Sequence, residues 1–327
     1  MNERHARTGL RGSLLLVAAG VLGRLPERPL VAGAEALGEL WYRIAPPKRV
    51  QARANLRRVC EGLAASGTGS AFARRAATDP EALERLVRRA FQHAARYYLE
   101  VARTGGLDPE TAAARMDFDT PDTVAAAVAA GKPIIMVGLH FGAIEMPVLF
   151  MSRRLGHRFT APMETVADPG LQRWFVESRS RVGVNIVQLA GARRTLLAAL
   201  RRGESIGLIS DRDLQDAGLP TPFFGHPAPI PVGPALLALE TGAPVYVAAA
   251  RRMKGGRYRA RMIHVPFPDA ATGTRRERLT AFTGAMVAAF ETILADAPEQ
   301  WWGAFHPIWR DLAADRGEPA ERAEAAP

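Results

Sequence analysis

One histidine and one glutamate stand where an enzyme built on a parallel sheet carries its reacting groups. His140 directly follows the apolar run 134–139, and Glu145 comes five residues later, at the start of the next expected helix. A histidine titrates near neutral pH and can act as a general base, and a nearby carboxylate can orient its imidazole. A capping or core histidine has the same spacing, so the pair is a hypothesis that needs structural context.

A second set of polar residues follows another apolar run. Asp211 and Arg212 come directly after residues 205–210. If the two runs are neighbouring strands, their carboxyl ends deliver Asp211 to the same rim as His140, with Arg212 beside it as a candidate for substrate binding. The structural alternative is an N-cap or turn aspartate followed by a solvated arginine.

Four further candidates for substrate binding are weaker when taken singly. Phe223 and Phe224 can line an apolar tunnel or pack in the core. Glu164 ends a short expected strand, and Arg179 lies on an expected helix, where a solvated arginine is the default. None of these residues assigns a chemistry alone.

Several kinds of site find no support in the sequence. It contains no Gly-x-Ser-x-Gly elbow, Walker A run or Gly-x-Gly-x-x-Gly turn. Cys60 is the single cysteine and the histidines are scattered, so we expect no disulfide framework and no metal site. The basic residues alternate with apolar helix faces rather than with exposed aromatic residues, which disfavours nucleic acid as a partner.

The elements that must position these residues alternate between strands and helices from about residue 120. Short apolar runs predict buried strands, and amphipathic segments between several of them predict helices. The expected strands are 134–139, 158–161, 184–188, 205–210, 244–250 and 257–265, and the expected helices are 143–155, 168–182, 191–202, 232–241 and 275–294. This pattern predicts an α/β fold, a single domain with a mainly parallel or mixed twisted sheet of about seven strands flanked by helices.

Helices precede the sheet. Residues 13–45 predict one or two amphipathic helices, which Pro46 ends because proline cannot sit inside a helix. A basic helix over 48–63 follows, and residues 64–79 have the composition of a loop. The next helix begins with Asp79 as N-cap and a proline in its first position, and extends to the glycines at 105 and 106.

The N-terminal segment carries an uneven share of the basic charge. The chain has 327 residues and a net charge of +10, from 43 Lys or Arg and 33 Asp or Glu. Arginines that flank an apolar, tryptophan-containing helix face favour a membrane interface with anionic headgroups, although an ordinary packed helix has the same pattern. We expect residues 1–50 to associate with a membrane without spanning it, 51–311 to form the folded domain, and 312–327 to be a disordered tail.

Five segments in order along the chain carry a combined signature: residues 54–59, 138–145, 175–183, 298–301 and 307–309. Together they resemble the bacterial lysophospholipid-type acyltransferases that include the lipid A late acyltransferases and the phosphatidylinositol mannoside acyltransferases. Residues 211–214, 223–225, 233–235 and 241–244 are most similar to the phosphatidylinositol mannoside branch. That branch usually has Asn-Trp where this chain has Ala143-Ile144, and often Glu at the position of Asp211.

The resemblance implies acyl transfer from acyl-CoA to a sugar hydroxyl of a membrane glycolipid, most closely the mannose of a phosphatidylinositol mannoside. His140 would remove the hydroxyl proton, with Asp211 as the preferred partner and Glu145 as a positioning residue. Glu164 and Arg179 match residues with functional weight in the family, and Arg179 would hold a phosphate or the oxyanion. The reaction needs neither a metal nor a redox cofactor.

The expected partners are acyl-CoA, a glycolipid acceptor and an anionic membrane surface. We expect peripheral attachment at the cytoplasmic face of the plasma membrane through residues 10–45, and a tunnel for the acyl chain lined in part by Phe223 or Phe224. Two alternatives stay open. One is a lipid A-type acyltransferase that uses an acyl-carrier protein as donor, and the other is a non-catalytic membrane-binding paralogue.

Overall fold

The computed structural model describes residues 21–22, 25–269 and 273–313, and a seven-stranded sheet lies at the centre of this part of the chain. The strand order is β1-β9-β8-β2-β5-β3-β4, and every neighbouring pair is parallel except β8 with β9. The strands are β1 (Met116–Phe118), β2 (Ile135–Gly138), β3 (Phe159–Met163), β4 (Val184–Gln188), β5 (Ser205–Ile209), β8 (Val245–Arg252) and β9 (Tyr258–Val265). The predicted single-domain α/β fold with a mainly parallel sheet is confirmed.

The central strands are buried on both faces. In β2, Ile135 and Val137 pack into the larger core, whereas Met136 packs into a second core on the opposite face together with Ile134. Successive side chains of a strand point to opposite faces, so a continuous apolar run is what a strand covered on both sides requires. This is why these strands could be located from the sequence.

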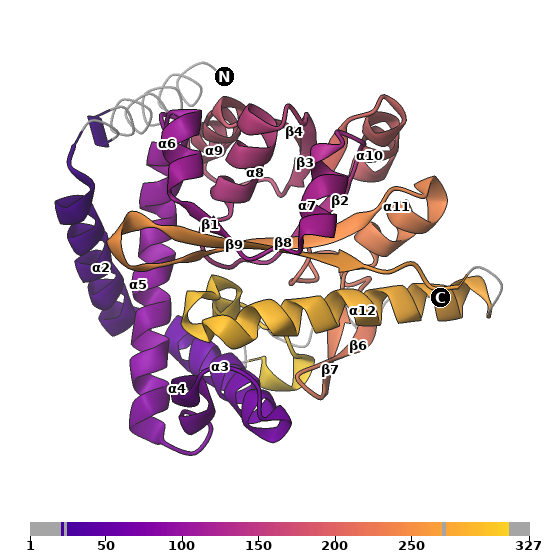
Figure 1. The fold of residues 1–327 in the computed structure, drawn as a ribbon. Coiled ribbons are helices and arrows are strands. Elements are labelled where there is room, and N and C mark those ends of the chain that lie inside the picture. The colour runs from indigo at the N-terminus through magenta and orange to yellow at the C-terminus, as the bar shows by residue number, and fades with distance from the viewer. Residues whose placement is uncertain (1–20, 23–24, 270–272, 314–327) are drawn as a thin grey trace, which may run out of the picture.

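Helices cover both faces of the sheet (Figure 1). Helix α8 (Glu145–Arg154) packs against β8 on the side of the second core, and α12 (Arg275–Asp296) runs along β8 and β9 on the side of the larger core. The other helices of this region are α6 (Pro109–Ala114), α7 (Asp122–Ala129), α9 (Pro169–Arg181), α10 (Ala192–Arg201) and α11 (Gly233–Thr241).

Helix α12 has the length and apolar composition of a membrane-crossing helix, and it is the only helix in the described part of the chain that does. However, Phe282, Met286 and Phe290 of this helix are buried in the larger core. Its apolar surface is therefore used for packing against the sheet and the hairpin beside it.

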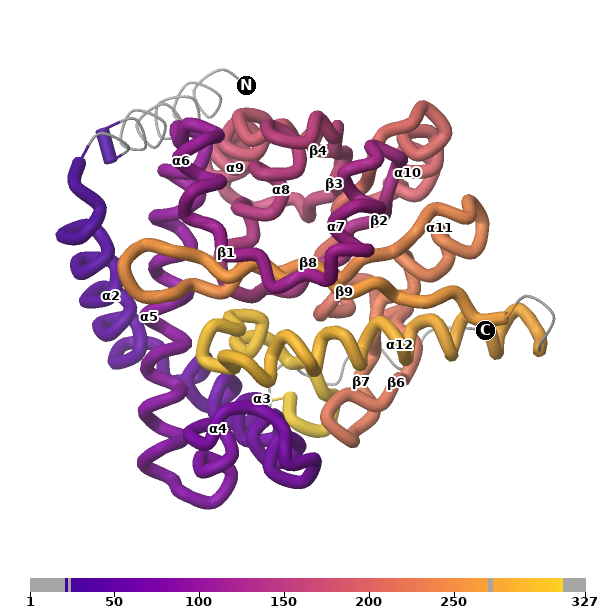
Figure 2. Tube along the Cα trace, viewed as in Figure 1, coloured from indigo at the N-terminus to yellow at the C-terminus, as the bar shows by residue number. Residues whose placement is uncertain are grey.

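The N-terminal helices form a separate layer beside the sheet. They are α2 (Glu27–Ile44), α3 (Pro46–Ser66), α4 (Ala71–Arg75) and α5 (Pro80–Thr104). Figure 2 shows α2 lying along α5, and Gly38 permits this close approach, because a Cβ there would lie only 2.5 Å from the Cα of Gln92. Helix α5 begins at the predicted cap, where the Asp79 carboxylate accepts hydrogen bonds from the N–H groups of Glu81 and Ala82.

The structure also contains elements that the sequence analysis missed. Strands β6 (Leu219–Phe223) and β7 (His226–Ile230) pair with each other as a separate antiparallel hairpin. Each contains two prolines, and a proline within a run normally argues against predicting a strand there. The expectation that residues 64–79 form a loop is wrong in part, because the Ser70 side chain caps α4 there. Residues 1–20 and 314–327, which hold much of the predicted N-terminal segment and tail, lie outside the described residues.

Candidate active site

Strand register brings His140 and Asp211 together. Strands β2 and β5 are parallel neighbours, and Gly138 is paired with Ile209 at their carboxyl ends. His140 and Asp211 each follow two residues after that pair, so the two chains leave the sheet side by side. Nδ1 of His140 lies 2.6 Å from Oδ1 of Asp211. The structure therefore places the two predicted groups in direct contact.

The Asp211 carboxylate is fully buried and receives three hydrogen-bond donors. Besides the His140 ring, the His140 N–H donates to Oδ2 at 3.0 Å and the Trp301 indole N–H donates to Oδ2 at 2.8 Å. Burial acts to raise the pKa of Asp211, but the adjacent His140 and these hydrogen bonds outweigh it, and the pKa lies below its usual value. Asp211 is therefore ionised at neutral pH.

An ionised carboxylate can only accept hydrogen bonds, so Nδ1 of His140 must carry the proton in this pair. Nε2 of the neutral ring is then the basic nitrogen. The His140 side chain is 16% exposed and lines a cavity, so this nitrogen is accessible to a bound substrate. The pair has the arrangement of a general base oriented by a carboxylate.

The C-terminal segment 300–303 lies beside the loop that carries His140. The backbone N–H of Trp302 donates to the His140 carbonyl at 2.8 Å, and Phe141 forms an antiparallel bridge with Trp301. A Cβ at Gly303 would lie 2.5 Å from Oδ2 of Asp211, so only glycine fits at this point. Trp301 belongs to the signature segment 298–301, but no local pattern indicates its partner, which lies 90 residues away in the sequence.

Trp302 restrains the His140 ring from the other side. Its ring meets the imidazole edge to face, with centroids 4.5 Å apart, and is stacked on Tyr97 with centroids 4.4 Å apart. His306 also lies close to the pair, and burial together with the charge of Arg212 lowers the pKa of His306 to about 3. His306 is therefore neutral at working pH, and His140 is the residue in a position to take up a proton.

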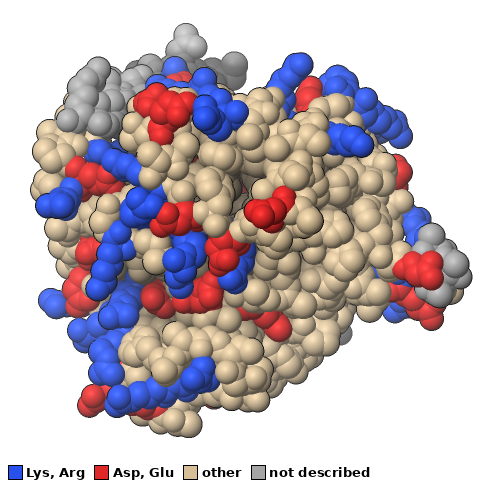
Figure 3. Space-filling view, viewed as in Figure 1, with Lys and Arg blue, Asp and Glu red and all other residues tan. Residues whose placement is uncertain are grey.

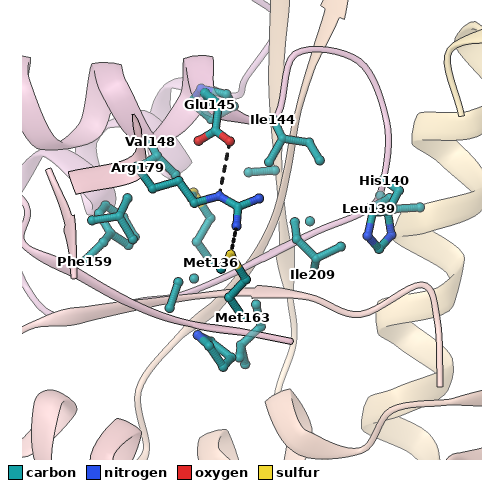
Figure 4. A pocket seen from close by; sticks show the side chains of 18 of the residues that line it. Met136, Leu139, His140, Ile144, Glu145, Val148, Phe159, Met163, Arg179 and Ile209 are labelled. Atoms are coloured by element: carbon teal, nitrogen blue, oxygen red, sulfur yellow. Dashed lines mark hydrogen bonds and ion pairs between the residues drawn. The ribbon is translucent and has the colours of Figure 1, made fainter. Parts of the chain in front are cut away.

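Glu145 is paired with Arg179 and not with His140. The Arg179 Nε atom lies 3.4 Å from Oε1 of Glu145, and Nη1 lies 2.6 Å from Sδ of Met163 (Figure 4). Nη2 of Arg179 donates to the Tyr97 hydroxyl at 3.2 Å. Burial acts to lower the pKa of Arg179, but Tyr97 and Glu145 outweigh it and raise the pKa above its usual value. The result is a fixed cation in the wall of the cavity.

The cavity beside His140 is largely apolar and has a volume of about 190 Å³. Strands β2, β3, β4, β5 and β8 and helices α8 and α9 contribute its wall, with apolar side chains that include Met136, Val148, Phe159, Ile186 and Leu208. Gly138 and Gly207 leave room where strand side chains would otherwise stand. Such a cavity suits an apolar substrate chain better than a polar one.

The remaining predicted residues fall into two groups. Glu164 lines the cavity and lies 4.0 Å from Arg212, which follows Asp211 directly. Phe223 and Phe224 are not among the cavity residues, and the expectation that they line the tunnel is not met. Both are buried in the larger core, where the Phe223 ring stacks on Trp309 and the Phe224 side chain lies against α3 at Gly62.

The described residues contain no group of three or more His, Cys, Asp or Glu side chains that could hold a metal ion. Cys60 is buried, and burial raises the pKa of its thiol to about 12. It is therefore not activated as a nucleophile. Within this part of the chain, the arrangement that can do chemistry is the His140–Asp211 pair beside the apolar cavity.

Replacing Trp301 with phenylalanine should destabilise the protein more than the same change at Trp309. Both indoles are fully buried, but Trp301 donates to a carboxylate, whereas Trp309 donates to the backbone carbonyl of Phe223 at 3.3 Å. A hydrogen bond to a charged group contributes ~1.5–3 kcal/mol, and one to a neutral group ~0.5–1.5 kcal/mol. We expect the free energy of unfolding to fall by roughly 1 kcal/mol more for Trp301→Phe.

This extra loss should depend on pH. The hydrogen bond from Trp301 lowers the folded-state pKa of Asp211, so its contribution is full above the unfolded aspartate pKa of about 3.9 and disappears as pH falls through the folded value. Urea unfolding of both variants across a pH series from neutral to acidic measures the difference. An extra loss that stays constant across the series would contradict this account of the carboxylate.

Comparisons with known proteins show what the chain as a whole is similar to. The family model for bacterial lipid A biosynthesis acyltransferases matches residues 2–311. A phosphatidylinositol mannoside acyltransferase from Mycolicibacterium smegmatis is 29% identical over 236 residues, which cover 71% of this chain and 75% of the relative. The protein of that name from Mycobacterium tuberculosis (strain CDC 1551 / Oshkosh) is 30% identical over 228 residues, 68% of this chain and 69% of the relative. The resemblance inferred from the sequence motifs is confirmed.

Proposed function

The chain belongs to the bacterial lipid A biosynthesis acyltransferase family, and from this premise we propose that it transfers a long-chain acyl group from acyl-CoA to a mannose hydroxyl of a phosphatidylinositol mannoside. The observation that carries the proposal is the His140–Asp211 pair beside an apolar cavity. The pair supplies the base for the hydroxyl, and the cavity supplies a wall for the acyl chain. The names of the relatives support the acceptor class.

The proposed reaction begins when Nε2 of His140 takes the proton from the acceptor hydroxyl. The oxygen attacks the thioester carbonyl, and the new C–O bond gives a tetrahedral oxyanion. Collapse of this intermediate breaks the C–S bond, and the His140 imidazolium returns the proton to the departing CoA sulfur. Asp211 remains ionised throughout and stabilises the imidazolium.

Arg179 is the proposed electrostatic partner of the reaction. Its guanidinium lines the cavity wall, and Glu145 and Tyr97 hold it in place. A pre-organised cation in a site shielded from water stabilises developing negative charge more than water does. We propose that Arg179 faces either the oxyanion or a substrate phosphate, and that Glu145 positions it.

Replacing Gly207 with valine tests whether the acyl chain of the donor lies in the cavity. Gly207 lines the cavity, and a Cβ there would meet no atom closer than 3.8 Å, so valine can be accommodated and would occupy cavity space. If that space holds about two methylenes, palmitoyl transfer should lose about 1.6 kcal/mol, or roughly 15-fold in kcat/KM. Octanoyl transfer should change less. Steady-state rates with both CoA esters give the ratio.

The matched control is Gly233→Val, since a Cβ at Gly233 also has open space around it but this residue is not part of the cavity wall. An unchanged ratio of palmitoyl to octanoyl transfer in Gly207→Val would place the acyl chain elsewhere. Acyl-carrier protein esters are included in the same assay. Transfer from these esters alone, without transfer from acyl-CoA, would overturn the proposed donor.

An exposed apolar ridge on α2 supports peripheral attachment to the membrane. Leu37, Leu40 and Ile44 are 64%, 52% and 69% exposed, and their spacing places them on one side of the helix. Figure 3 shows Lys and Arg side chains gathered near α2 and α5 on the face in view, interspersed with acidic ones. We propose that this ridge enters the interface of an anionic membrane at its cytoplasmic face.

Changing Leu37, Leu40 and Ile44 together to glutamine should release the protein from anionic liposomes. Fully burying such a side chain contributes ~1.5–3 kcal/mol, so even half-inserted side chains together account for more than tenfold in binding. Liposome flotation at low and high salt measures this, and salt should weaken the remaining binding by screening. Phe267→Gln, which removes a 40% exposed apolar side chain elsewhere, is the control. Equal flotation of the triple variant and the control would exclude α2 as the attachment site.

A further inference from the structure

A buried ion pair lies behind the loop that carries His140. Arg252 is the last residue of β8 and its side chain is 1% exposed. Its Nε and Nη2 atoms each lie 2.7 Å from a carboxylate oxygen of Glu100 on α5. Taking two charges out of water is costly, and an apolar pair of similar volume is often as stable or more stable. The pair therefore suggests a geometric requirement at this place.

The same guanidinium holds the middle of the catalytic loop. Nη2 of Arg252 donates to the Gly142 carbonyl at 2.8 Å, and the Gly142 N–H donates to the Gln300 carbonyl at 3.0 Å. Gly142 has a φ of 56°, and a Cβ there would lie 2.1 Å from the carbonyl oxygen of Ala250 on β8. The loop is thus held on both sides, two residues after His140.

Gln300 connects this arrangement to the carboxylate of the pair. Its side-chain Oε1 accepts from the Arg252 N–H at 2.8 Å, and its Nε2 donates to the Arg252 carbonyl at 2.9 Å. The next residue, Trp301, donates to Asp211. Arg252 is therefore joined both to the loop that carries the base and to the segment that holds its partner.

We infer that Arg252 is a positioning residue for acyl transfer and that Glu100 fixes the orientation of its guanidinium. Arg252 contacts no reacting atom, and it acts by setting the place of His140 relative to Asp211. The inference rests on the proposed function in taking His140 as the base. Displacing a reacting group by about 1 Å can lower the rate about 10²-fold, so a loop that is no longer held should cost turnover rather than substrate affinity.

The double variant Glu100→Leu/Arg252→Met tests this inference. It removes both charges at once, so no uncompensated charge is left in the core and the fold should survive. We expect kcat to fall about 10²-fold while KM for acyl-CoA stays within about threefold. Thermal unfolding followed by circular dichroism verifies that the variant is folded. Asp117→Leu/Arg257→Met removes an exposed pair between β1 and the residue just before β9, and it should leave kcat within about twofold.

A second measurement does not depend on activity. The proton on Nδ1 of His140, which is hydrogen-bonded to Asp211, should give a downfield proton NMR signal. The loss of this signal in His140→Ala identifies it. This signal should move or disappear in Glu100→Leu/Arg252→Met and persist in Asp117→Leu/Arg257→Met. A folded double variant with wild-type kcat and an unchanged signal would overturn the inference. An active His140→Ala enzyme would instead overturn the proposed function, and the NMR result would still decide whether Arg252 positions the ring.

Discussion

Replacing His140 with alanine is expected to lower kcat by about 10²–10⁴-fold, the usual contribution of a general base. The substitution keeps the backbone N–H of residue 140 and the Trp301 indole as donors to the buried Asp211 carboxylate, so the fold should survive. The substitution removes the nitrogen that takes the proton from the hydroxyl of the glycolipid. Among the described residues of the cavity wall, no other side chain combines a free basic nitrogen with a carboxylate partner. Release of free CoA, corrected for thioester hydrolysis without acceptor, measures turnover.

His264→Ala is the matched control, because His264 is exposed on β9 and is not part of the cavity wall. It should retain wild-type turnover. If His140→Ala transferred acyl groups as fast as His264→Ala, the general-base mechanism would be refuted, and with it the assignment of the reaction to this pair.

The second large effect is expected for Asp211→Asn, with a loss of turnover of the same order as for His140→Ala. Asparagine has nearly the size of aspartate, but it turns one of the two accepting oxygens into a donor. Three donors already point at this buried side chain, two of them from His140 and one from Trp301. The amide therefore favours the wrong tautomer of His140, with the proton on Nε2, and removes the charge that stabilises the imidazolium.

The two losses should not add, because His140 and Asp211 act as one unit. The His140→Ala/Asp211→Asn enzyme should be about as slow as the slower single variant, as a double-mutant cycle on initial rates will measure. Glu145→Gln should cost less than Asp211→Asn, since Glu145 contacts Arg179 and not the base. A nearly inactive Glu145→Gln enzyme beside an active Asp211→Asn enzyme would show that the wrong carboxylate has been assigned.

The central parallel strands could be predicted because they are buried on both faces of the sheet and their sequences are therefore continuous apolar runs. β4 lies at residues 184–188, as predicted, whereas β2 is one residue shorter than predicted at each end and β5 is one residue shorter at its C-terminal end. The β6–β7 hairpin could not be predicted in the same way. Its strands contain prolines, and they pair outside the main sheet, where missing N–H groups cost less. The short β1 likewise depends on its pairing with β9.

The part of the site that lies at the carboxyl ends of strands could be predicted from the sequence. His140 and Asp211 both follow apolar runs, and the register of β2 with β5 explains why they meet. The contacts of Trp301 with Asp211 and of Arg252 with Glu100 join residues 90 and 152 positions apart, so no local pattern indicates them. The same limit explains the error at Phe223, the last residue of β6, since an aromatic residue there can line a cavity or pack in a core, and only tertiary packing decides.

The most direct test of the proposed function is the product of one reaction. Purified protein is incubated with palmitoyl-CoA and a phosphatidylinositol mannoside in anionic vesicles, and the lipids are analysed by tandem mass spectrometry, with the His140→Ala enzyme in parallel. We predict a glycolipid that has gained one palmitoyl ester on a mannose, formed by the wild-type enzyme and absent with His140→Ala. Free palmitate without an acylated glycolipid, or equal product from both enzymes, would contradict this account.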